Sequence, residues 1–166
     1  SCHESERVSV VAGEVRRARG LSVMNVGAIT TSTAAKGARG AARAGCEAIA
    51  CLPPFLIKAS QRSIIDHYKA VAEAAEGLPL FAYNVPQLTY VNFDRPLMEA
   101  LRKEVPTLIG LKHSAPDLGM IRTWSEMGLA CFSGFGQLAL PALAIGPVGS
   151  IYAPFSVAPL LYGHLY

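Results

Sequence analysis

Two kinds of hydrophobic pattern alternate along the chain. Short, nearly continuous apolar runs are typical of strands covered on both faces, and they occur at residues 21–26, 48–52, 80–84, 108–112, 129–133 and 149–153. Apolar residues at helical spacing lie between these runs. Strands that alternate with helices in this way pair in parallel through helical crossovers. The pattern therefore predicts an α/β fold, either an open doubly wound sheet or a barrel.

Two of the predicted helices have clear starting points. Ser60 can cap a helix whose apolar residues share one face. Asp94 can cap the next helix, which carries Pro96 in its first turn. Further helices are expected at residues 4–18, 33–44 and 116–127.

Composition narrows the class of protein. Of 166 residues, 51% are hydrophobic and 16% are charged, which excludes a disordered chain and allows a sizeable core. The net charge of +3 is too small to indicate nucleic-acid binding. The local basic group Arg16, Arg17 and Arg19 is typical of a solvated helix end. No apolar run approaches the roughly 18 residues of a membrane span.

Cysteine and histidine residues do not suggest a metal site. Cys2, Cys46, Cys51 and Cys131 form no C-x-x-C pair, so we expect neither a zinc site nor a disulfide framework. Cys46 and Cys51 flank an apolar run and are interpreted as core residues. This usage of cysteine favours a reducing, cytoplasmic compartment. His67 lies in the middle of a predicted helix and is expected at the surface or at an interface.

A nucleotide-binding sheet lacks its usual sequence fingerprint in this chain. No G-x-G-x-x-G motif follows a strand, and no glycine-rich loop ends in Lys-Ser or Lys-Thr. Residues 133–136 contain only G-x-G, which a plain turn explains equally well. An unrelated open α/β ligand-binding domain therefore has no phosphate-binding loop to support it.

Polar residues at the carboxyl ends of two neighbouring strands are the candidate chemistry. Lys112 ends an otherwise apolar strand, and Tyr83 lies at the end of the preceding strand. Function collects at these strand ends in parallel α/β folds. Removal from water favours a neutral lysine amine, which can attack a carbonyl group, and the tyrosine can hold a proton nearby. The alternative is a lysine that reaches solvent. His113 should point the opposite way, toward the helices.

A series of short motifs follows the chain in a characteristic order: Val26-Gly27-Ala28, Leu52-Pro53-Pro54-Phe55, Tyr83-Asn84-Val85-Pro86, Gly110-Leu111-Lys112, and Ser133-Gly134 followed by Leu140-Pro141-Ala142-Leu143. The closing Val157-Ala158-Pro159 fits the same series. In these motifs the chain resembles the dihydrodipicolinate synthase/N-acetylneuraminate lyase family of class I, Schiff-base-forming pyruvate aldolases. The resemblance covers essentially the whole chain.

The resemblance implies a TIM (β/α)₈ barrel in which Lys112 forms an imine with pyruvate or another 2-oxo acid. Tyr83 would shuttle a proton as the carbon–carbon bond to an aldehyde forms or breaks, and no metal or organic cofactor is needed. Gly134 and Ile151 match positions that line the pyruvate pocket, and Ser114 matches a small hydroxyl position of the lyase branch. Relatives are commonly tetramers or dimers, so a homo-oligomer is expected, without nucleic-acid or membrane partners.

Departures from the family pattern leave the aldehyde partner open. Residues 87–89 read Gln-Leu-Thr where the synthase branch carries an arginine that binds a dicarboxylate. Gly136 and Gln137 replace an acidic pair that is frequent in sialic acid lyases. Leu56 stands where many relatives lend a tyrosine to a neighbouring subunit. These differences speak against dihydrodipicolinate synthesis and leave N-acetylneuraminate undecided.

The family pattern also begins with two strands, and the second ends in a G-T-T-G-E or G-S-T-G-E loop that binds the pyruvate carboxylate. Nothing of this kind precedes Glu4. We therefore expect residues 1–166 to form a single partial barrel domain with about six of the eight strands, N-terminally truncated. A non-catalytic remnant of the family, acting at most as an interaction module, is the alternative function.

Overall fold

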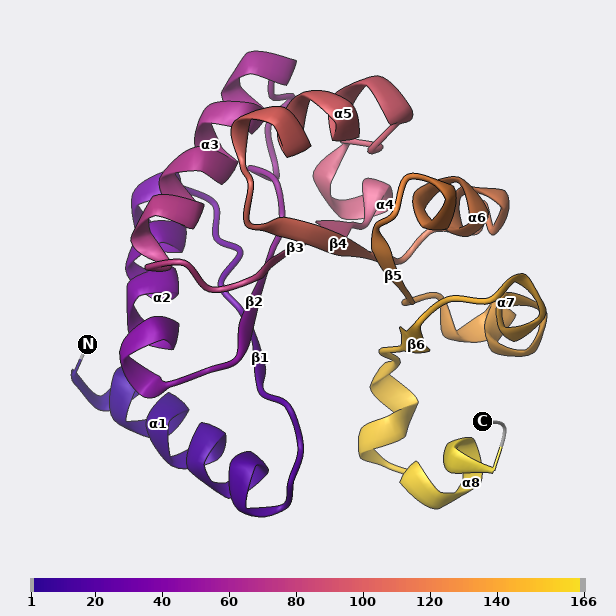
Figure 1. Cartoon of the computed structure of the whole chain (residues 1–166), viewed down its shortest axis with the longest axis horizontal. Coiled ribbons are helices and arrows are strands. Elements are labelled where there is room, and N and C mark those ends of the chain that lie inside the picture. Colours follow the sequence, from indigo (N-terminus) through magenta and orange to yellow (C-terminus); the bar gives the residue numbers. More distant parts are fainter. Residues whose placement is uncertain (1, 165–166) are drawn as a thin grey trace.

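The computed structural model describes the backbone of residues 2–164, and its side chains from residue 7 onward. A single parallel sheet has the strand order β1-β2-β3-β4-β5-β6, and it curls into an arc with helices on its outer side (Figure 1). The strands are β1 (Val23–Asn25), β2 (Ala48–Cys51), β3 (Leu80–Asn84), β4 (Leu108–His113), β5 (Ala130–Ser133) and β6 (Gly149–Ser150). This arrangement confirms the prediction of a partial TIM barrel.

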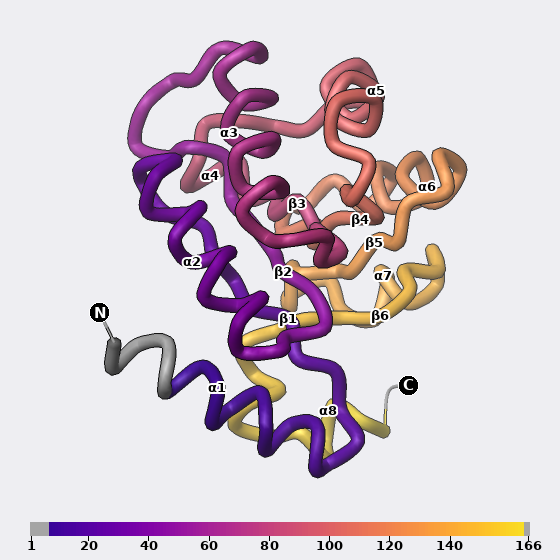
Figure 2. Tube along the Cα trace, turned by 60° about the vertical axis from the view of Figure 1, so that its left-hand side comes forward, coloured from indigo at the N-terminus to yellow at the C-terminus, as the bar shows by residue number. Residues whose placement is uncertain are grey.

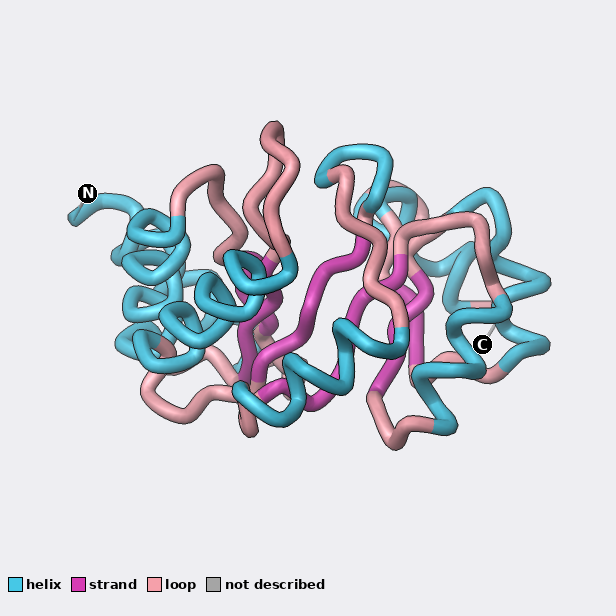
Figure 3. The backbone as a smooth tube through the Cα atoms, turned by 90° about the horizontal axis from the view of Figure 1, so that it is seen from above, coloured by secondary structure: helices cyan, strands magenta, loops and turns pink. Residues whose placement is uncertain are grey.

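Helices connect successive strands and lie outside the sheet (Figure 1). They are α1 (Cys2–Arg17), α2 (Thr31–Ala44), α3 (Gln61–Ala74), α4 (Pro86–Thr89), α5 (Arg95–Glu104), α6 (Gly119–Glu126), α7 (Ala139–Ile145) and α8 (Pro159–Gly163). Short 3₁₀ helices, η1 (Gly136–Leu138) and η2 (Ala153–Ser156), follow β5 and β6. Viewed from above, the connecting loops gather at the two ends of the strands (Figure 3). No helix in the described part of the chain has the length and hydropathy needed to cross a membrane.

The predicted helix starts are confirmed at two caps. The Ser60 hydroxyl accepts a hydrogen bond from the Ser63 N–H, and the Asp94 carboxylate accepts one from the Leu97 N–H. Each cap satisfies a backbone donor that has no partner inside the helix. The helix expected at 116–127 begins later, at Gly119, because the Asp117 side chain accepts from the Gly119 N–H in the turn before it.

Most strands differ in length from the predicted runs. β6 ends at Ser150 instead of residue 153, because a 3₁₀ helix begins at Ala153 and the next residue, Pro154, has no N–H to give to a sheet. β1 covers only Val23–Asn25 of the predicted 21–26 run. β4 extends one residue further than expected, to His113, and its pairing with β3 shifts between Leu80 and Phe81.

The core lies between the sheet and the helical layer. α2 contributes only small side chains, with Ala34, Ala38 and Ala41 fully buried, so this helix packs closely on its neighbours. α2 and α3 lie side by side outside β2 (Figures 1 and 2). Larger side chains such as Trp124 and Tyr68 fill the space under the other helices. The expected core positions of Cys46 and Cys51 are confirmed, whereas the side chain of Cys2 lies outside the described residues.

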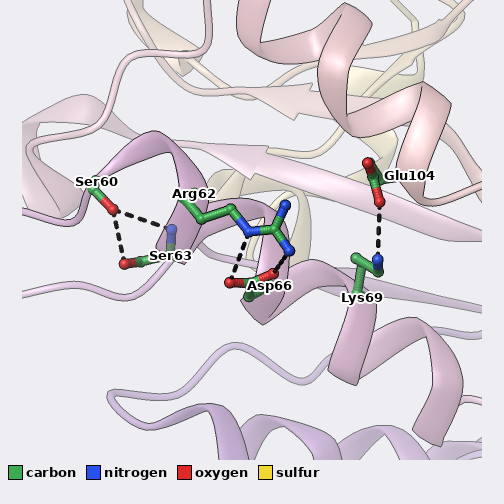
Figure 4. Close-up of polar contacts among 6 residues, drawn as sticks. All are labelled: Ser60, Arg62, Ser63, Asp66, Lys69 and Glu104. Carbon is green, nitrogen blue, oxygen red and sulfur yellow. Dashed lines mark hydrogen bonds and ion pairs between the residues drawn. The ribbon is translucent and has the colours of Figure 1, made fainter.

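Arg62 and Lys69 form ion pairs on the exposed side of α3 (Figure 4). Arg62 pairs with Asp66 one turn later at 2.9 Å, and the Lys69 ammonium lies 2.8 Å from the Glu104 carboxylate of α5. The hydrogen bond and charge of Glu104 raise the pKa of Lys69, and the same contacts lower the pKa of Glu104. Exposed pairs of this kind contribute little to stability, so the apolar core holds α3 and α5 in place.

The expectation that His67 lies at the surface or an interface is wrong. Its side chain is 1% exposed inside this chain. Its Nδ1 lies 2.9 Å from the Thr31 hydroxyl, and its Nε2 lies 3.1 Å from the Leu52 carbonyl oxygen. His67 therefore joins the start of α2 to the loop after β2. The helical spacing of Ile64, His67 and Val71 places all three on the buried face.

We predict that His67 makes the protein less stable in mild acid. Burial lowers the pKa of His67 below its ordinary value of about 6.5, so the unfolded chain binds the proton first as the pH falls. The stability present above about pH 6.5 is then lost as the pH falls further. The melting temperature, followed by circular dichroism, should fall between pH 7.5 and pH 5.5.

The His67→Gln variant keeps a donor for the Leu52 carbonyl and removes the titration. It should melt lower at pH 7.5 but show a smaller drop toward pH 5.5. His164→Gln, at an exposed site, is the matched control and should leave the pH dependence unchanged. Equal pH dependence in the wild type and the His67 variant contradicts the prediction.

Candidate active site

Tyr83 and Lys112 face each other across two neighbouring strands. They are register partners in the β3–β4 pair. Ala82 and Leu111, which precede them, belong to the core under the helices, so Tyr83 and Lys112 point to the opposite, inner face of the sheet. The Lys112 Nζ donates a hydrogen bond to the Tyr83 hydroxyl at 3.1 Å and lies 4.3 Å from the centre of its ring. The structure therefore brings together the two residues that the sequence singled out.

The surroundings of Lys112 on the inner face are aromatic and tightly spaced. Phe132 of β5 is its register partner. The Phe132 ring packs edge-to-face on Phe81, with 5.4 Å between the ring centres. Gly110, two residues before the lysine, allows β4 and β5 to approach, because a Cβ there would lie 2.0 Å from the Ala130 carbonyl oxygen. Phe132 thus borders the lysine on the side of β5.

Ser114 and Gly134 lie directly beside the lysine side chain. The Ser114 hydroxyl donates to the Gly134 carbonyl oxygen at 3.0 Å, and the Gly134 N–H donates to the His113 carbonyl at 2.8 Å. A Cβ on residue 134 would lie 2.1 Å from the Ser114 Oγ and 2.8 Å from the Lys112 Cε. Only glycine fits at this position without a shift of the lysine.

Ile151, the remaining predicted site residue, is bonded through its backbone to the end of β5. Its N–H donates to the Ser133 carbonyl at 2.9 Å, and its side chain is 40% exposed just after β6. A pocket of about 490 Å³ beside Gly134 is lined by Gly134, Gly136, Gln137, Tyr152, Ala153, Pro154 and Tyr162. The residue after Ile151, rather than Ile151 itself, thus reaches that pocket.

Tyr152 lines this pocket and is a candidate that the sequence reasoning missed. Its hydroxyl donates to the Ser133 Oγ at 2.7 Å and accepts from the Ser150 Oγ at 3.2 Å, so the ring is fixed against the end of β5. None of the residues that line the pocket carries a charge. The pocket is therefore suited to a neutral group with hydroxyl or apolar parts.

Gln87 is a second residue whose role was not predicted. It lies in α4, the turn that follows β3, and its Nε2 donates to the Ser114 carbonyl at 3.0 Å. The side chain thus ties the loop after β3 to the loop after β4. In the sequence, the only feature that points to Gln87 is its position directly after the Tyr-Asn-Val-Pro motif.

In the part of the chain that the structure describes, Cys51, Cys131 and the possible metal ligands offer no competing site. Burial raises the pKa of the Cys51 and Cys131 thiols to about 12, so both stay protonated and unreactive. Among the residues that the structure describes, no group of three or more His, Cys, Asp or Glu side chains could hold a metal ion. Lys112 is the candidate nucleophile that the geometry supports.

Comparisons with known proteins show what the chain is similar to. The model of the family described as "Dihydrodipicolinate synthetase family" matches residues 1–166. The 4-hydroxy-tetrahydrodipicolinate synthase of Rhizobium meliloti is 33% identical over 164 residues, which cover 95% of this chain and 54% of that protein. The corresponding enzyme of Neisseria gonorrhoeae is 32% identical over 167 residues, which cover 98% of this chain and 52% of that protein.

A solved structure of the wild-type sialic acid aldolase of Ruminococcus gnavus has the same fold. It superposes with a TM-score of 0.86 at 26% sequence identity, covering 95% of this chain and 54% of that one. The chain thus spans about half the length of the curated relatives that it matches.

We predict that Gly134→Ala is destabilising, because the added methyl group would overlap Ser114 and Lys112. Overpacking of this kind costs about 1–3 kcal/mol. Gly136→Ala is the matched control, since a Cβ there meets only the Tyr152 ring at ordinary distances of 3.8 Å and more. Urea denaturation of both variants measures the difference, and equal midpoints would show that the site accommodates the methyl group.

Proposed function

The chain belongs to the dihydrodipicolinate synthetase family, and on this basis we propose that it carries the catalytic lysine of a Schiff-base-forming aldolase or lyase. The substrate is a 2-oxo acid that is cleaved to, or formed from, pyruvate and an aldehyde. The contact between the Lys112 amine and the Tyr83 hydroxyl is the observation that carries the proposal.

The proposed reaction begins at the lysine amine. The neutral Lys112 Nζ attacks the keto carbon of pyruvate, and loss of water from the adduct leaves a protonated imine. This cation accepts the electron pair when a C3 proton leaves, so that an enamine forms. The enamine carbon then attacks the aldehyde carbon, and water releases the product from Lys112. The cleavage direction runs through the same steps in reverse.

Tyr83 is proposed to move the protons of this sequence. Its hydroxyl lies within hydrogen-bond distance of the amine, so it can relay a proton from the nitrogen to the oxygen of the adduct. It then gives its own proton to the leaving hydroxyl, which departs as water, and Tyr83 is left as a tyrosinate. The tyrosinate takes the proton that leaves C3, and the restored hydroxyl delivers it to the aldehyde oxygen when the new bond forms. Ser114 and Gly134 lie where they limit the space around the imine.

The pocket beside Gly134 is the proposed place for the aldehyde. Its lining offers Gln137 and two phenol rings but no charge. Gln87, which follows the Tyr-Asn-Val-Pro motif, uses its amide to hold the Ser114 carbonyl. A neutral, hydroxylated or apolar aldehyde fits these groups better than a dicarboxylate. We also propose that the whole protein self-associates, as members of this family commonly do.

We predict that pyruvate with sodium borohydride adds one reduced pyruvate to the wild-type chain at Lys112. Intact-mass and peptide-mass spectrometry locate the adduct. Lys112→Ala should abolish it, whereas Lys36→Ala, which removes an exposed lysine, should leave it unchanged. An adduct that survives Lys112→Ala contradicts the assignment. A folded, cooperatively melting wild type without any adduct would instead favour the non-catalytic alternative.

A separate prediction concerns Tyr83. Tyr83→Phe retains the ring but removes the hydroxyl, so the imine should still form while proton transfer at C3 slows. General acid–base groups contribute about 10²–10⁴-fold, and the loss should fall in that range. Exchange of the pyruvate methyl protons in deuterated water, followed by NMR, measures it. Unchanged exchange in this variant would remove Tyr83 from the mechanism.

A further inference from the structure

Asn84 and His113 form a buried pair directly behind the candidate site. They follow Tyr83 and Lys112 in sequence and are register partners in the same two strands. Because side chains alternate along a strand, they point to the helical side while the lysine and tyrosine point inward. Asn84 is 0% exposed and His113 is 1% exposed, which confirms the expected orientation of His113.

The hydrogen bonds of this pair link four segments of the chain. The Asn84 amide group donates to the His113 Nδ1 at 3.0 Å and to the Asn92 Oδ1 at 3.3 Å, and its Oδ1 accepts from the Phe93 N–H at 3.4 Å. The His113 Nε2 lies 2.8 Å from the Asp117 carbonyl oxygen. The pair thus connects the ends of β3 and β4 to the loops that follow them.

These contacts define the state of the histidine. Nε2 must carry the hydrogen, since its partner is a carbonyl oxygen, and Nδ1 must then be the acceptor for the Asn84 amide. A charged imidazole would turn an N–H toward the amide hydrogens and break this contact. Burial also lowers the pKa of His113, which agrees with a neutral ring.

We propose that Asn84 and His113 are positioning residues that hold Lys112 and Tyr83 at reacting distance. The inference rests on the proposed function of Lys112. The Asn84–His113 hydrogen bond joins β3 to β4 one residue beyond the lysine and tyrosine, next to the backbone bond from the Ser114 N–H to the Asn84 carbonyl at 2.8 Å. It keeps the ends of β3 and β4 together where each strand continues into a loop.

The lysine needs this support because its side chain is long and has many rotamers. The 3.1 Å contact to Tyr83 persists only if the two backbones stay in register. A displacement of about 1 Å in a reacting group can reduce a rate by about 10²-fold. A link on the covered face can therefore control chemistry on the open face without touching the substrate.

Two substitutions test the hydrogen bonds at His113 Nδ1 and Nε2 one at a time. In His113→Asn the amide oxygen can take the place of Nδ1 and accept from Asn84, while the bond to Asp117 is lost. In His113→Gln the amide nitrogen can take the place of Nε2 and donate to Asp117, while the bond from Asn84 is lost. Each variant lacks one hydrogen bond, so the two should melt at similar temperatures.

The rate of borohydride-trapped imine formation with pyruvate is the first readout. We expect His113→Asn to stay within about threefold of the wild type and His113→Gln to fall by about 10–100-fold at saturating pyruvate, because only the second variant loses the bond that joins the two strand ends. Equal rates in the two variants, or losses that simply follow their melting temperatures, overturn the proposal.

A second readout does not depend on pyruvate. Reductive methylation with formaldehyde modifies lysines without a substrate pocket, and peptide mapping gives the rate at Lys112 relative to the exposed Lys36. Release from Tyr83 should raise the relative rate at Lys112 by about threefold or more in His113→Gln but not in His113→Asn. If the wild type forms no pyruvate adduct, the proposed function fails, and this comparison still decides the positioning role. Equal relative rates in both variants contradict it.

Discussion

The parallel pairing of β3 with β4 is the contact on which the site depends. Its register places Tyr83 opposite Lys112 on the inner face and Asn84 opposite His113 on the covered face. The same few residues thus supply an amine, a proton carrier and the internal polar link between their strands. The core under α3 and α5 stabilises this pairing, because Leu80, Ala82 and Leu111 are buried there without exposure to water.

The two faces of the sheet have different roles. The helical face is closely packed and stabilises the fold, whereas the inner face is more open and carries the candidate chemistry. The helical side contains alanines, aromatic rings and two neutral histidines whose hydrogen bonds are satisfied. The inner side keeps Lys112 beside Tyr83. Changes to the covered face should therefore affect the site mainly through the strand ends.

Much of this arrangement was predictable from the sequence, and the rest required tertiary contacts. The strands were found because buried parallel strands are continuous apolar runs, and Lys112 was conspicuous because it ends one of them. The burial of His67 was misjudged because a polar residue on a helix is usually exposed, while its partners Thr31 and Leu52 lie far away in sequence. The roles of Gln87 and Tyr152 likewise depend on loops whose paths no local pattern gives.

The irregular pairing near the start of β4 has a consequence for the lysine. Leu80 pairs with Leu108 and Phe81 with Gly110, so Ile109 is an extra residue in β4. Strict alternation counted from the core residue Leu108 would turn Lys112 toward the helices. The irregularity takes Ile109 out of the ladder, and Lys112 therefore stays on the open face. If Ile109 instead entered the regular ladder, Lys112 would exchange faces with its buried neighbours, although every motif in the sequence would remain intact.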